Sequence, residues 1–147
     1  MAAPTYDELK ALSFGYLNGS DVLRYCPFQV LQKQIAIDAD SVQIGCDIAY
    51  SEALSTLGAR YDIETELTKT DDTRYSLMVK IIAIMAIRNI VSNQAGLPQN
   101  MIDQFEWVKQ TILNIRNGQE SLAGMKISPV ARRSGTELIP SSFTTLG

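Results

Sequence analysis

One long apolar run, from Tyr75 to Val91, limits more than any other feature how this chain can fold. Its residues are Tyr-Ser-Leu-Met-Val-Lys-Ile-Ile-Ala-Ile-Met-Ala-Ile-Arg-Asn-Ile-Val, with neither Gly nor Pro among them. A run of this length is typical of a helix rather than of a buried strand. Since apolar residues occupy nearly every side of that helix, we expect protein neighbours all round it, which makes it the central helix of the fold.

A transmembrane helix is the rival interpretation of the same run. Such a helix needs about 20 predominantly apolar residues. Lys80 and Arg88 interrupt this run, and only Ile81 to Ile87 lie between them without a charge. The sequence therefore predicts a core helix near residues 73–95 and no membrane association.

Two further segments repeat apolar residues with a helical period. The segment near 39–61 carries Val42, Cys46, Ala49, Tyr50, Ala53, Leu54 and Leu57. The segment near 98–117 carries Met101, Ile102, Phe105, Val108, Ile112 and Ile115, and Asn117-Gly118 is a good helix end. Asp38 or Asp40 is expected to cap the first of these helices. Together with the central helix, they predict an all-α protein, a small bundle of three main helices.

The remaining N-terminal and connecting segments are shorter. Thr5 and Glu8 fit a capping box, which predicts a short N-terminal helix. Ser20 or Asp21 is expected to cap another helical turn, interrupted by Pro27. Residues 28–37 are ambiguous between helix and extended chain, and the polar residues 62–73 fit either a loop or a short hairpin arm.

The composition changes after Gly118, which divides the chain into a helical domain, 1–118, and a C-terminal segment, 119–147. This segment is rich in Gly, Pro, Ser and Thr and has no helical period, so it cannot fold alone. An extended arm that orders on a partner and a flexible tail are equally good interpretations. For the arm, the expected contact residues are Lys126, Ile127, Arg132, Arg133, Leu138, Ile139 and Phe143.

Charge is unevenly distributed in this chain of net charge −3. Nine acidic and two basic residues lie between 38 and 72, whereas most of the charged residues in 73–118 are basic. Solvated faces are the simpler explanation, and head-to-tail contact between identical subunits is the alternative. For such a contact we predict an acidic side with Asp47, Glu52, Glu64 and Glu66 and a basic side with Arg74, Arg88 or Arg116. Burial of apolar residues such as Trp107 would supply the rest of the affinity. No clustered Lys/Arg face indicates binding to duplex DNA.

Catalytic and metal-binding patterns are not found. The chain has no His, and Cys26 and Cys46 are not in a C-x-x-C pattern, so we expect two reduced thiols. No phosphate-binding loop or nucleophile elbow occurs, and the acidic pairs lie in a polar connection where solvated charge is ordinary. We expect no enzymatic activity, no cofactor and no metal. The N-terminus lacks the features of a secretory signal, which predicts an intracellular product.

The order of these pieces resembles a known family. A short helix with Asp21-Val-Leu23 precedes a helix ending Leu57-Gly-Ala-Arg-Tyr61, and a later helix ends Trp107-(x5)-Leu113-(x4)-Gly118. Over about residues 5–130 the chain resembles the head-completion, or head–tail connector adaptor, proteins of tailed bacteriophages. Arg60-Tyr61 is the most specific piece and Leu113…Gly118 the second. The sequence departs from the family at Cys26-Pro27-Phe28 and in its Ser/Thr-rich tail.

The resemblance implies a structural subunit of the virion neck, made in the host cytoplasm. Such subunits form a ring, usually of twelve copies, beneath the portal protein. The ring extends the DNA channel without gripping DNA, and it docks the next neck or tail protein. In such adaptors the C-terminal arm commonly docks on the portal. A cytosolic helical scaffold or regulatory protein that binds a peptide is the alternative function.

Overall fold

A computed structural model of the chain describes residues 4–70, 73–122, 125 and 127. The predicted all-α fold is confirmed. The helices of this described part are α1 (Tyr6–Lys10), α2 (Gly19–Tyr25), α3 (Phe28–Ile37), α4 (Ser41–Leu57), α5 (Ile63–Glu66), α6 (Ser76–Ile90) and α7 (Gln99–Arg116). Its only β pairing consists of two isolated bridges.

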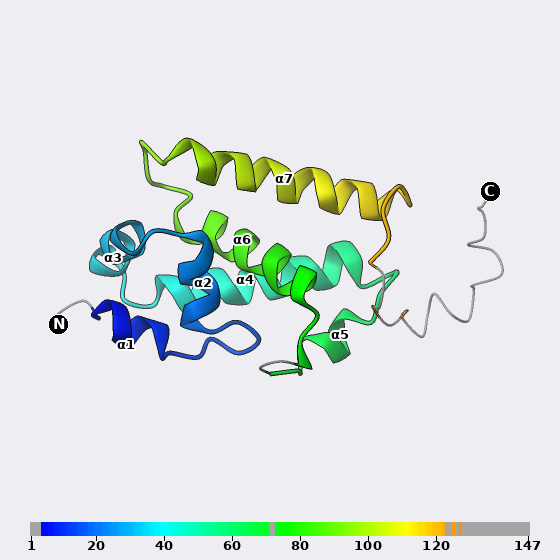
Figure 1. The fold of residues 1–147 in the computed structure, drawn as a ribbon, viewed down its shortest axis with the longest axis horizontal. Coiled ribbons are helices and arrows are strands. Elements are labelled where there is room, and N and C mark those ends of the chain that lie inside the picture. Colours follow the sequence, from blue (N-terminus) through cyan, green and yellow to red (C-terminus); the bar gives the residue numbers. More distant parts are fainter. Residues whose placement is uncertain (1–3, 71–72, 123–124, 126, 128–147) are drawn as a thin grey trace.

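Helix α6 is the centre of the fold, as its sequence predicts. Every residue from Ile81 to Ile87 is buried, as are Met78 and Ile90. Helices α2, α4 and α7 all pack against it. Figure 1 shows α7 along one edge of the molecule, with α1 and α5 at the opposite edge and α4 and α6 between them. Because α6 has neighbours on several sides, it can be apolar nearly all round.

Helix α4 packs tightly against α6 at Gly45. A Cβ atom built on Gly45 would lie 2.4 Å from Cγ1 of Ile90 and 3.1 Å from the carbonyl oxygen of Ala86. Only a residue without a side chain fits at this crossing.

Substitution of Gly45 by Val is expected to cost about 1–3 kcal/mol of stability, because the new side chain overpacks the α4–α6 contact. Ser51→Val is the matched control. Ser51 is an exposed residue of the same helix, so a valine side chain there meets no clash. That control should change stability by less than about 0.5 kcal/mol. Urea unfolding followed by circular dichroism measures both, and equal losses would show that the crossing has room.

The main helices are shorter than their sequence patterns predict. Segment 39–61 contains α4 at 41–57, segment 73–95 contains α6 at 76–90, and segment 98–117 contains α7 at 99–116. Asp40 does occupy the N-cap position of α4, but its side chain accepts no capping hydrogen bond. Tyr75 and Pro98 take the corresponding positions before α6 and α7. Gly118, with φ of +76°, follows the end of α7 as predicted.

The N-terminal half holds one confirmation and several corrections. Thr5 and Glu8 form the predicted capping box. For α2, however, the N-cap is Asn18 rather than Ser20 or Asp21, and Asp21 completes that capping box. The ambiguous residues 28–37 form helix α3. The connection 62–73 contains the short helix α5. Its N-cap residue is Asp62, whose side chain accepts a hydrogen bond from the Thr65 N–H.

Two residues predicted for the buried stripes are exposed instead. Leu54 of α4 and Ile102 of α7 lie on the outer surface, whereas their neighbours Ala53 and Met101 are fully buried. Successive residues are about 100° apart around a helix. Leu54 and Ile102 therefore fall outside the stripes that face α6, and both helices carry more exposed apolar surface than the sequence predicts.

The hydrophobic core continues past the predicted boundary at Gly118. Leu122 and Met125 belong to the same buried cluster as Tyr61 and Ile63. The Leu122 backbone N–H also donates a hydrogen bond to the Tyr61 hydroxyl, at 2.9 Å. The residues just after α7 are thus part of the helical domain.

Candidate functional site

Glu66, one of the predicted subunit-contact residues, lies inside the molecule. It is 2% exposed and accepts hydrogen bonds from the Tyr16 hydroxyl at 2.5 Å and from the Tyr75 backbone N–H at 2.7 Å. Lys69 forms an ion pair with the same carboxylate at 3.0 Å. Burial, and then the hydrogen bond to Glu66, raise the pKa of Tyr16 well above its ordinary value, so the phenol keeps its proton and donates it.

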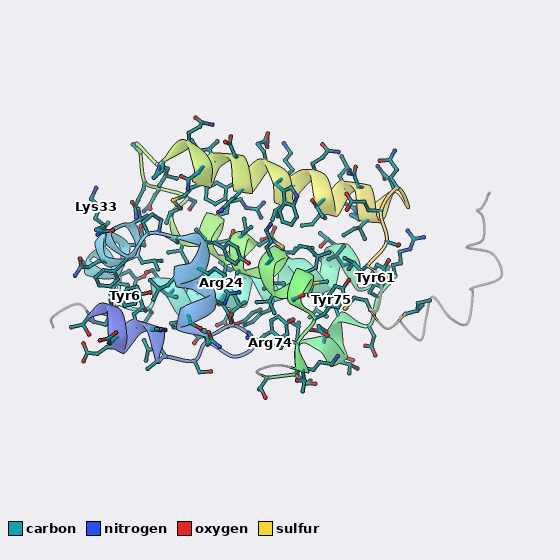
Figure 2. The ribbon with its side chains drawn as sticks, viewed as in Figure 1. Tyr6, Arg24, Lys33, Tyr61, Arg74 and Tyr75 are labelled. Atoms are coloured by element: carbon teal, nitrogen blue, oxygen red, sulfur yellow. The ribbon has the colours of Figure 1, made fainter. Side chains whose placement is uncertain are left out.

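Arg74, a predicted contact residue on the basic side, is held beside this cluster. Its Nη1 donates to Oδ2 of Asp21 at 2.5 Å and to the carbonyl oxygen of Tyr16 at 2.8 Å. Figure 2 shows Arg74 and Tyr75 next to each other where the chain enters α6. The contacts of Glu66 and Arg74 tie the N-terminal loop to the start of α6. The charges of Glu66 and Arg74 are thus paired within the chain.

Glu52 and Arg88 are also paired within the chain. Nη2 of Arg88 lies 2.7 Å from Oε2 of Glu52, and the side-chain amide of Asn89 donates to the other carboxylate oxygen at 3.2 Å. Both charged side chains are about one-third exposed. This ion pair lies between α4 and α6 and contributes about 0–1 kcal/mol to stability, as exposed pairs do.

The other four predicted contact residues, Asp47, Glu64, Trp107 and Arg116, are exposed. Asp47 accepts a hydrogen bond from its helix neighbour Gln43 and has no cationic partner among residues 4–70 and 73–122. Trp107 lies at the edge of α7, where the Lys80 ammonium is 4.3 Å from the ring centroid. This cation–π contact fixes an exposed ring.

Exposed apolar side chains gather on the outer faces of the two long helices that flank α6. On α4 they are Ile44, Ile48 and Leu54, and on α7 they are Ile102 and Leu113. Single exposed apolar residues are ordinary, but repeated ones on one helix face often mark a contact surface. The chain therefore carries exposed apolar residues on both α4 and α7, which suit protein contacts.

Arg60 and Tyr61 hold the end of α7 and the residues that follow it. The Arg60 guanidinium donates to the carbonyl oxygen of Ile115 at 3.1 Å, which satisfies an acceptor at the end of α7. Tyr61 binds the Leu122 N–H and forms an antiparallel bridge with Ile127, which is 49% exposed. The remaining residues predicted for the arm contacts lie outside the described part: Lys126, Arg132, Arg133, Leu138, Ile139 and Phe143.

Several charged side chains line a hollow beside α5. This hollow of about 430 Å³ lies between α5 and the start of α6, lined by Glu66, Lys69, Arg74 and their neighbours. Its charged groups already have partners within the chain. No group of three potential metal-ligating His, Cys, Asp or Glu side chains occurs within 4–70 and 73–122, and no helix there is long and apolar enough to cross a membrane.

Comparisons with protein-family models, curated proteins and solved structures found no match to this chain. The candidate contact surfaces on α4 and α7 therefore rest on the geometry of this chain alone. Sequence reasoning missed the Tyr16–Glu66 and Asp21–Arg74 contacts, because they join residues 50 and 53 positions apart. The only signal in the sequence was that acidic residues predominate between 38 and 72 and basic residues between 73 and 118.

Proposed function

We propose that the chain is a head–tail connector subunit of a tailed bacteriophage. It forms a ring beneath the portal protein, with the twelve copies that the family resemblance implies, and passes DNA through its lumen. It docks the next neck or tail protein on its far side. The mature location is the virion neck, after assembly in the host cytoplasm.

This proposal rests on a contact between the two helix endings that carry the resemblance, Arg60-Tyr61 and Leu113…Gly118. Arg60 binds the last turn of α7 at Ile115, and a Cβ on Gly118 would lie 3.4 Å from the Arg60 guanidinium. Tyr61 holds Leu122 just beyond. The motif residues thus act together to fix where the chain leaves the bundle, as a subunit that presents a C-terminal arm to a partner requires.

The helical domain supports the proposal in a second way. Its helices share one hydrophobic core, and its exposed apolar residues are repeated on α4 and α7. A ring subunit needs two separate lateral surfaces, since each copy touches a different neighbour on either side. A peptide-binding scaffold would instead need one groove.

The test is attachment to the portal. Purified full-length chain is mixed with portal rings of the phage that encodes it, and the mixture is separated by sedimentation. We expect the chain to sediment with the portal and to add a ring-shaped layer in electron micrographs. A chain that stays unbound, and that is missing from purified virions by mass spectrometry, would contradict the proposal and favour the cytosolic scaffold.

A further inference from the structure

Two exposed surfaces of this chain carry the same pattern with opposite charge. At the start of α4, Asp40 (the N-cap residue) and Asp47 flank Ile44, which follows the first by four residues and precedes the second by three. On α7, Lys109 and Arg116 flank Leu113 with the same spacing of four and three. We call these sets the acidic triad and the basic triad.

Both triads face solvent. Ile44 and Leu113 are 47% and 45% exposed, and the four charged residues are exposed as well. Residues three and four apart share one side of a helix, so each triad presents two charges about 10 Å apart with an apolar side chain between them. None of these charged groups has an ion-pair partner in the described part of the chain.

We infer that the acidic triad of one copy binds the basic triad of a second copy, with Ile44 packed against Leu113. The equal spacing lets both ion pairs form at once, whether the two helices run parallel or antiparallel. Like triads repel, which disfavours symmetric α4–α4 and α7–α7 pairing. This inference deepens the proposed function and rests on it for one point, that the head-to-tail contacts close into a ring.

The size of the contact predicts its strength. A triad spans seven residues, and two helices meeting over that length bury much less than the roughly 800 Å² per partner of a standard interface. The isolated chain should therefore associate weakly. Several contacts act together once copies are held side by side on a partner, because the effective concentration then rises steeply.

Cross-linking of mixed single-cysteine chains tests the inference. One full-length chain carries Ile44→Cys and the other, enlarged by a tag, carries Leu113→Cys. The native Cys26 and Cys46 do not interfere, because both are buried and burial raises the pKa of each thiol to about 12. With a short bismaleimide we expect the mixed dimer, and either variant alone should give at least about tenfold less product.

Charge reversal supplies the specific control. Asp40→Lys with Asp47→Lys on the first chain should reduce the mixed product about tenfold, and Lys109→Glu with Arg116→Glu on the second should restore it. A Gln32→Cys chain, exposed on α3, should give no product with the Leu113→Cys chain. Circular dichroism checks that each variant is folded.

Three outcomes would overturn the inference: no mixed product, equal products from single variants, or no rescue by the second reversal. These outcomes are separate from the proposed function. A chain that sediments with the portal yet fails this assay remains a connector with other lateral contacts. A chain that passes here but never binds the portal self-associates for a different purpose.

Discussion

Replacing Arg74 by Met is expected to lower the free energy of unfolding by about 3 kcal/mol. The substitution keeps most of the side-chain volume but leaves the Asp21 carboxylate, which is 5% exposed, without its cation. The carbonyl oxygen of Tyr16 loses a donor as well. Asp21 retains its hydrogen bond from the Asn18 N–H, which keeps the loss near the lower end of values for buried pairs.

Arg88→Met is the matched control, since Arg88 also forms an ion pair with an acidic residue of an earlier helix. The Glu52–Arg88 pair is about one-third exposed, so breaking it should cost at most about 1 kcal/mol. Urea unfolding of the two variants beside the unaltered chain measures the difference. Similar losses would mean that burial does not distinguish the two pairs.

Two C-terminal deletions are expected to differ sharply in stability. Removal of residues 119–147 takes Leu122 and Met125 out of the core, at about 1.5–3 kcal/mol for each buried side chain, so a loss of about 3–6 kcal/mol follows. Removal of residues 128–147 leaves both side chains in place and should change stability by less than about 1 kcal/mol.

Portal attachment gives the second readout for the same deletions. If the predicted arm binds the portal, both shortened chains should fail to sediment with it, although the chain lacking 128–147 remains stable. Thermal unfolding and sedimentation together separate a folding defect from a binding defect. A stable, shortened chain that still binds the portal would show that the arm is only a tail.

The parts of the fold that the sequence predicts are those set by local pattern. The run from Tyr75 to Val91 identifies α6, because a long apolar segment without Gly or Pro has few other solutions. Helix α3 remained ambiguous because it is only ten residues long and the β-branched Val30, Ile35 and Ile37 also suit an extended chain. It is held partly by Gln34, whose side-chain carbonyl accepts from Gln94, 60 positions away.

The proposed interaction surface was harder to predict than the fold. The charge split suggested contacts between acidic and basic residues, but it could not tell which pairs close within the chain. Glu66 accepts a hydrogen bond from Tyr16, and Arg74 forms an ion pair with Asp21. No local feature of the sequence indicates those partners. The triads became visible only when the structure established that Ile44 and Leu113 are exposed.

The central position of α6 has a consequence for how the chain is made. During synthesis α6 emerges before α7, and the residues from 91 to 116 must follow before α7 can cover it. At about 5–20 residues per second, this leaves apolar side chains such as Ile84 and Ile87 open to other nascent chains for roughly 1–5 s. A ribosome stalled before residue 116 would hold a strongly aggregation-prone product, so overexpression at lowered temperature with a chaperone should raise the yield of soluble protein.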